Sequence, residues 1–191
     1  AAGLLAGAAS VTVDLPDDTP LAGYGGFPRR AWLPDLFGRH PDTFWFRPNR
    51  GVHDPIKVRA LVLEAAGARV LWITADLIGM DASLVSDVRT RLDQLGLRYS
   101  AVVAAASHTH SGPGAFARSD LFGFIAVDRE STRDRGRLFS GVEGGARQAE
   151  RRRRPATVGT GRSEIAGLTD SRVREPLDPD LGVLKVMGAD A

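Results

Sequence analysis

The stretch AVVAAASHTHSGPG, residues 101–114, decides how the rest of the chain is arranged. The apolar run Ala101–Ala106 predicts a strand covered on both faces, because small and β-branched residues suit a buried sheet. Side chains two positions apart on an extended segment point the same way, so we expect His108 and His110 to face one pocket. The Ser-Gly-Pro-Gly segment then ends the strand and lets the backbone approach whatever the imidazoles hold.

Two imidazoles at a strand end suggest a metal site, and zinc is the metal that suits them best. Zinc needs three or four ligands, however, and this motif shows only two; His53 is the one further imidazole we consider. The pair could equally hydrogen-bond to loop carbonyl groups, so the spacing leaves both interpretations open. The sequence contains no His-Glu-x-x-His helix and no cysteine, which excludes those classes of zinc site.

The sequence before the motif predicts a strand, a helix and then the motif strand. Arg69–Asp76 is the first strand, a helix is expected between its N-cap Asp81 and Gly96, and Tyr99–Ala106 is the second strand. Such a unit joins parallel strands by a right-handed crossover. Their carboxyl ends share one edge of the sheet, where α/β proteins bind ligands, so Asp76 should converge on the two histidines.

Asp76 has two interpretations at this edge. A carboxylate beside a metal-bound imidazole commonly orients that ligand, which would give Asp76 a part in catalysis. Alternatively, Asp76 simply caps a turn.

The remaining pattern predicts an α/β fold in which helices pack on a mixed sheet. A short turn joins residues 58–64 to Arg69–Asp76 as an antiparallel β-hairpin. The other predicted elements are a strand at Ser10–Asp14, a helix at Arg133–Arg154, and strands at Ala156–Arg162 and Gly182–Met187.

Length and charge narrow the class of protein. The 191 residues make one domain or part of a larger one, with a net charge of +2. Arginine supplies nearly all the cations, a bias that indicates a GC-rich coding sequence more than a nucleic-acid site, which would need the charge concentrated on one face. The run Arg151–Arg154 fits the C-terminus of a helix, whose dipole favours cations. No apolar run is long enough to span a membrane, and residues 1–9 either end a signal peptide or, as we favour, lead into the first strand.

Residues 15–55 form a long irregular segment rich in glycine, proline and aromatic residues. A loop of this length inside a domain usually serves as a lid or as the wall of a pocket. It could also pack its aromatic side chains on the domain surface as an Ω-loop does.

Several segments together resemble the neutral/alkaline, non-lysosomal ceramidases. The string His-Thr-His-Ser-Gly-Pro is the most specific of them, and the others occur in the order found in that family. The resemblance covers nearly the whole chain and corresponds to the amino-terminal part of the catalytic domain, so residues 1–191 are interpreted as incomplete. The segments are Ser10–Asp14, Pro20–Gly25, Gly51–Pro55 and His108–Gly114.

The resemblance implies a zinc-dependent amidase that splits N-acylsphingosine into a fatty acid and a sphingoid base. It implies that His108 is a zinc ligand, that His110 lies beside the zinc-bound water and that Arg172 faces the substrate. The other family ligands, a histidine, a glutamate and a tyrosine, fall in later sequence, so the rest of the catalytic domain is needed to complete the site.

The family further implies a ceramide-type lipid as substrate, peripheral contact with a membrane surface, no nucleic-acid partner, and a secreted or periplasmic location. Two other functions stay open at this stage. One is a different metal-dependent amidohydrolase that uses the same His-x-His pair. The other is a catalytically incomplete fragment or lipid-binding module.

Overall fold

The structure, a computed structural model, describes residues 3–168, 170–171, 173 and 176–189. The elements that precede the motif strand are β1 (Leu5–Thr12), β2 (Lys57–Ala65), β3 (Ala68–Ala75) and α1 (Ala82–Gln94). The motif strand and the elements after it are β4 (Ala101–Ala106), α2 (Asp120–Phe122), the π-helical turn η1 (Gly123–Val127), α3 (Thr132–Arg151), β5 (Arg154–Glu164) and β6 (Asp180–Gly188).

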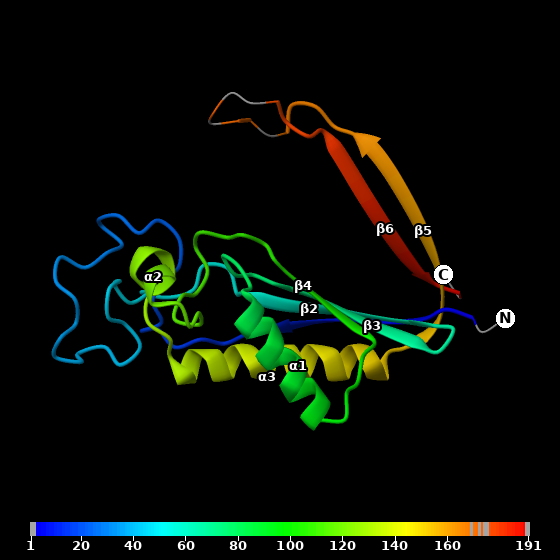
Figure 1. Cartoon of the computed structure of the whole chain (residues 1–191), viewed down its shortest axis with the longest axis horizontal. Coiled ribbons are helices and arrows are strands. Elements are labelled where there is room, and N and C mark those ends of the chain that lie inside the picture. The colour runs from blue at the N-terminus through cyan, green and yellow to red at the C-terminus, as the bar shows by residue number, and fades with distance from the viewer. Residues whose placement is uncertain (1–2, 169, 172, 174–175, 190–191) are drawn as a thin grey trace.

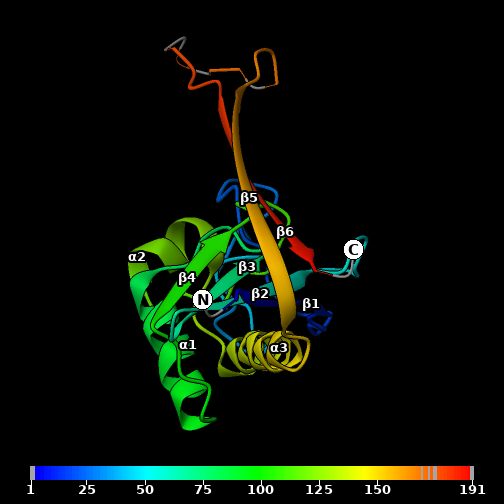
Figure 2. The ribbon, with the colours of Figure 1, turned by 90° about the vertical axis from the view of Figure 1, so that its right-hand side faces the viewer.

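The strands form one six-stranded mixed sheet in the order β4-β3-β2-β1-β5-β6 (Figures 1 and 2). β2 and β3 form the predicted antiparallel hairpin, and β3 pairs with β4 in parallel after the helix α1. The α/β fold class and the strand–helix–strand unit predicted from the sequence are therefore confirmed. Because β1, β3 and β4 run in the same direction, their carboxyl ends lie at one edge of the sheet.

Helices α1 and α3 cover one face of the sheet, and the hydrophobic core lies between these helices and the sheet (Figure 2). Helix α3 packs on β1 and β2 through glycines: a methyl group on Gly145 would lie 3.5 Å from the Cβ atom of Ala60 in β2, and one on Gly141 only 2.5 Å from Cγ2 of Val13, the residue after β1. The apolar face predicted for this helix is buried, as are alternate residues of the strands. The largest fully buried side chains are those of Val58, Val62, Leu71, Ile73, Leu77, Leu84, Val88, Leu92, Val127 and Val142.

Several details of the elements differ from those expected. β1 begins at Leu5, earlier than predicted, because the small residues at its start pair fully with β2. Helix α3 ends at Arg151, and Arg154 already belongs to β5, since the residue before a proline disfavours the helical conformation. Residues 115–130, which showed no clear pattern, contain α2 and η1. Within the described residues, no helix is both long enough and apolar enough to cross a membrane.

The hairpin of β5 and β6 projects away from the body of the sheet (Figures 1 and 2). β5 pairs with β1 through only two residues, Pro155 with Leu5 and Arg154 with Ala6. Most of the hairpin is exposed on both faces. Its attachment to the sheet is therefore narrow, and the opposite end of the sheet carries the predicted site.

A buried carboxylate anchors the long irregular segment 15–55. Asp128, at the end of η1, is fully buried, and its side chain accepts hydrogen bonds from the backbone N–H groups of Phe44, Trp45 and Phe46 at 2.9–3.1 Å. A buried carboxylate needs such donors to offset its lost hydration. These bonds hold the segment against η1 although it contains no helix or named strand.

A second buried carboxylate, Asp134 in the first turn of α3, is only partly satisfied. Its side chain is almost fully buried, and Oδ1 accepts a hydrogen bond from the Thr19 hydroxyl at 3.1 Å, whereas Oδ2 has no hydrogen-bond partner in the part of the chain that the structure describes. Burial, and then the neighbouring Asp42 carboxylate, raise the pKa of Asp134 to about 6; Thr19 and Arg133 act in the opposite direction. The folded protein therefore holds a proton on Asp134 more tightly than the unfolded chain does.

We expect Asp134→Asn to stabilise the protein at pH 7.5 but not at pH 4. Because the folded-state pKa is raised, the wild-type protein loses stability as the pH rises from about 4 to about 6, by on the order of 2–3 kcal/mol. Asparagine keeps the acceptor for Thr19 and carries no charge. Urea unfolding across this pH range measures the difference, with Asp93→Asn on the exposed face of α1 as a control for net charge. A stability difference independent of pH would contradict the assignment.

Candidate functional site

The pairing of β3 and β4 continues beyond both strands and fixes the histidine segment. The ladder ends at the pair Ala75 and Ala106, and Ser107 then donates its backbone N–H to the Ala75 carbonyl at 3.0 Å. Thr109 donates likewise to Leu77 at 3.2 Å. The motif is therefore held at the carboxyl edge of the sheet, as the sequence predicts.

The two imidazoles of the motif face each other. Their Nε2 atoms lie 3.3 Å apart and their ring centroids 5.0 Å apart. His108 has a left-handed backbone with φ of 58°, so the pair does not simply continue the extended strand. The Nδ1 atom of His108 lies 2.7 Å from the Ile78 carbonyl oxygen, and it must donate there. A neutral His108 therefore keeps its lone pair on Nε2, which points toward His110.

The segment Pro20–Gly25 closes over the motif from the other side. Ala22 donates its N–H to the Gly112 carbonyl at 2.9 Å, and Gly114 donates to Pro20 at 2.6 Å. Gly23 has φ of +124°, and a methyl group there would lie 2.7 Å from the His110 carbonyl oxygen and 2.9 Å from its Cβ. The sequence predicts a turn or close approach here, and the structure shows that only glycine fits.

Two side chains of the irregular segment contact His110. The Tyr24 ring lies 4.7 Å from the imidazole, centroid to centroid. The Arg29 guanidinium donates to the carbonyl groups of Ala22 and His110, and it reaches Ser111 Oγ at 3.4 Å. The Nδ1 atom of His110 is buried and has no hydrogen-bond partner among the described residues. Neither Tyr24 nor Arg29 was identified from the sequence, because no local pattern links that segment to the motif.

Asp76 lies at the predicted edge, but its bonds hold the strand ends together. Its carboxylate accepts the Lys57 N–H and an Arg59 guanidinium N–H, each at 2.9 Å, and it also interacts with Ser107. Burial raises its pKa, but these hydrogen bonds outweigh burial and leave the pKa below its usual value. Among the described residues neither imidazole is a partner of Asp76, so its part in catalysis stays a prediction.

A cavity of about 920 Å³ opens beside the motif at this edge. Asp76, Ser107, Thr109 and Ser111 contribute to one wall, and both ends of the segment 15–55 contribute to the rest, with His53 among them. The His53 side chain is 97% exposed and contacts Asp54. The segment therefore forms part of a pocket wall, which was one of its two predicted roles.

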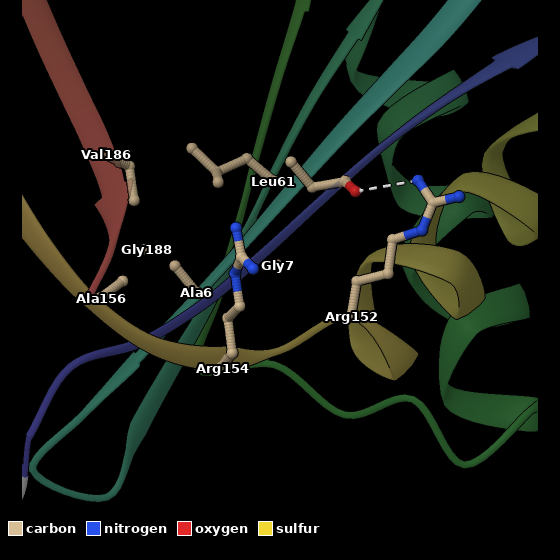
Figure 3. Close-up of a pocket in the computed structure, with 9 residues that line it drawn as sticks. Ala6, Gly7, Leu61, Arg152, Arg154, Ala156, Val186 and Gly188 are labelled. Atoms are coloured by element: carbon tan, nitrogen blue, oxygen red, sulfur yellow. Dashed lines mark hydrogen bonds between the residues drawn. The ribbon is translucent and has the colours of Figure 1, made fainter. Parts of the chain in front are cut away.

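Two other hollows lie near the β5–β6 hairpin. Figure 3 shows the one of about 420 Å³, whose lining includes Arg152, Arg154, Leu61 and Val186. The other, of about 700 Å³, lies between the face of the sheet that carries Trp72 and the hairpin. Neither contains a predicted site residue.

The histidine pair fits a zinc ion in part. Two nitrogen ligands of a tetrahedral zinc lie about 3.3 Å apart, given Zn–N bonds of about 2.0–2.1 Å. The spacing of the Nε2 atoms suits two ligands of one ion, or one ligand with the second imidazole beside it. The Ile78 carbonyl also provides the partner that commonly orients a metal-binding histidine. Within the described ranges no three His, Asp or Glu side chains gather around one metal position.

Arg172, predicted to face the substrate, lies outside the described residues.

Comparison with solved structures finds the same fold in ceramidases. A ceramidase complexed with C2 superposes with a TM-score of 0.77 at 19% identity. The neutral ceramidase from Pseudomonas aeruginosa superposes with a TM-score of 0.78 at 20% identity. Each alignment covers 100% of this chain and 30% of the ceramidase chain.

No family model matches the chain, and no curated protein matches it in sequence. The chain spans about 30% of the length of the ceramidases it matches. At this identity the likeness is one of fold. The resemblance to neutral ceramidases inferred from the motifs is confirmed at that level.

We expect Gly23→Ala to disturb the His110 contact and to lower the free energy of unfolding by about 2 kcal/mol or more, because backbone atoms cannot yield to the added methyl group. Gly26→Ala is the matched control, since a methyl group there meets nothing within 4 Å. Urea unfolding and the NMR signals of the His110 ring measure the two effects. Equal stability of the two variants would show that the close approach is not needed.

Proposed function

We propose that this chain supplies the histidine-bearing part of a zinc-dependent ceramidase, which hydrolyses the amide bond of ceramide to a fatty acid and a sphingoid base. The premise is the fold, which the chain shares with a part of the two ceramidase structures that makes up about 30% of each ceramidase chain. One of these ceramidases is complexed with C2. The observation that carries the proposal is the pair His108 and His110, joined through Nε2 at the carboxyl edge of the sheet.

His108 is proposed as the zinc ligand. Its Nδ1–H is occupied by the Ile78 carbonyl, so the neutral ring offers only Nε2 to a metal. When bound, zinc supplies Lewis acidity, which polarises an amide carbonyl and lowers the pKa of water. The further ligands would come from segments other than those described, as the resemblance implies.

His110 is proposed to move the proton that amide hydrolysis requires. Water gives its oxygen to the acyl carbon, the C–N bond breaks, and the leaving nitrogen needs a proton. An imidazole beside the reacting groups can take a proton from water and give it to the amine. Tyr24, Arg29 and Gly23 hold the His110 ring and backbone in place.

The metal assignment predicts that zinc binding depends on His108. Elemental analysis of the natural polypeptide that contains this chain should find about one zinc per chain, which is lost in His108→Ala. His53→Ala is the control, because its exposed imidazole contacts only Asp54 among the described residues. Full zinc occupancy in His108→Ala would exclude the assignment.

The activity assignment predicts a difference between the 191 residues alone and the longer polypeptide. Because the candidate site of the shorter chain holds only the imidazoles of His108 and His110, this chain should bind zinc weakly and should release no detectable fatty acid from a fluorescent ceramide. The longer polypeptide should do both, and His110→Ala should keep zinc while losing at least about 100-fold in rate. If the short chain reaches a comparable rate, the site is complete within it and the ligand set differs from the one proposed.

A further inference from the structure

Asp128, at the end of η1, combines a strained backbone with a completely buried side chain. Its φ of 69° and ψ of −179° lie in a region that is essentially restricted to glycine, and the residue has no exposed surface. Such a conformation is costly and persists only where the surrounding structure imposes it, most often at functional sites. Glycine would occupy this position without that cost. The presence of aspartate therefore indicates that the carboxylate itself is needed here.

The carboxylate holds a run of backbone N–H groups in the irregular segment. Phe44, Trp45 and Phe46 donate to it at 2.9–3.1 Å, and Arg129 donates to its Oδ1 atom at 2.7 Å. Successive N–H groups that converge on one anion form a nest, here called the 44–46 nest. These residues belong to no helix or named strand, so the bonds to the carboxylate set their backbone conformation.

The 44–46 nest is one side of a short antiparallel pairing. Arg47, the residue after the nest, donates its N–H to the Arg29 carbonyl at 2.9 Å. Ala31 donates its N–H to the Trp45 carbonyl at 3.0 Å. This pairing places the backbone of residues 29–31 relative to the nest, and therefore relative to the carboxylate that holds the nest.

The Arg29 side chain extends from this pairing to the histidine motif. Its guanidinium donates to the carbonyl groups of Ala22 and His110, and it reaches Ser111 Oγ at 3.4 Å. A guanidinium is a rigid fork of donors, so the bonds that it forms depend on where the backbone places it. A continuous series of contacts therefore runs from Asp128 through the nest and Arg29 to His110.

We propose that Asp128 is a positioning residue for His110, acting through the 44–46 nest and Arg29. The carboxylate fixes the nest, the nest fixes residues 29–31, and the Arg29 guanidinium then holds the His110 carbonyl. The part of this role that concerns the reaction rests on the proposed function, in which His110 moves a proton. A misplacement of about 1 Å at such a group lowers the rate by about 100-fold. The positioning itself is tested without ceramide and without zinc.

The test measures the rate at which diethyl pyrocarbonate modifies the His110 imidazole. The protein is the natural polypeptide that contains this chain, kept in a metal chelator, and peptide mass spectrometry reports each histidine. His53, whose side chain is 97% exposed, is the internal reference. Asp128→Asn should raise the His110 rate relative to His53 by at least about fivefold, because the loss of hydrogen bonds to a carboxylate shifts the opening of the segment by more than that factor.

Asp128→Gly separates the carboxylate from the backbone strain. Glycine relieves the strain but supplies no acceptor, so it should raise the His110 rate as Asp128→Asn does. The control for lost stability is Leu92→Ala, because Leu92 is buried near the end of α1, at the opposite edge of the sheet from the motif. This control should leave the His110 rate within about twofold of the wild type.

Two further measurements connect Asp128 to Arg29 and to the reaction. If Asp128 acts through Arg29, the double variant Asp128→Asn/Arg29→Gln should react no faster than about the faster of the two single variants. In hydrolysis of a fluorescent ceramide, Asp128→Asn should lower kcat at least about tenfold and change KM less than about twofold, because the substrate still binds but the proton is transferred poorly.

The proposal is overturned if Asp128→Gly behaves as the wild type or if Leu92→Ala raises the His110 rate as much as the Asp128 variants do. It is also overturned if the effects of the Asp128 and Arg29 substitutions multiply. A wild-type polypeptide that hydrolyses no ceramide would count against the proposed function. In that case, a raised His110 rate in both Asp128 variants would still support the positioning of His110 by Asp128.

Discussion

The parallel pairing of β3 with β4 is the interaction on which the candidate site depends. It brings together two segments that helix α1 separates in the sequence, and it continues past the strands through the bonds of Ser107 and Thr109. These bonds place His108 where its Nδ1 meets the Ile78 carbonyl, which fixes the ring and directs Nε2 toward His110. Backbone pairing thus sets the position of the motif, and one side-chain hydrogen bond sets the orientation of the His108 ring.

The second constraint is the close approach of the irregular segment. Backbone hydrogen bonds from Ala22 and Gly114 bind the segment to the motif, and Gly23 allows the contact because it has no Cβ. Asp128 then holds the far part of the same segment through three successive N–H groups. A segment without regular structure is therefore anchored at two places, and between them Trp32, Leu33, Leu36 and Phe37 stay exposed.

The sheet itself is asymmetric. Its helical face is closed by α1 and α3, whereas the other face leaves Trp72 and Val103 about 40% exposed. Parallel strands are usually covered on both faces, and the sequence predicted this for Ala101–Ala106. That prediction is wrong, because β4 is the edge strand of the sheet and none of its residues is fully buried. The β5–β6 hairpin only partly faces this surface, with Leu184 and Val186 lining a hollow beside Trp72. The chain spans about 30% of the length of the ceramidases it matches.

The sequence by itself determined the α/β class, the hairpin, the parallel unit and the edge of the sheet that carries His108, His110 and Asp76. Each of these follows from local periodicity, from cap residues such as Asp81 and Gly96, and from the handedness of a parallel connection. Only the tertiary structure decided what surrounds the histidines. The contacts of Arg29 and Tyr24 with His110, and those of Asp128 with Phe44–Phe46, join residues about 80 positions apart and leave no periodic signal. The tertiary structure likewise decided that the Asp76 carboxylate bonds to Lys57 and Arg59. A carboxylate at a strand end bonds to the nearest unpaired donors, and the sequence does not show which donors those are.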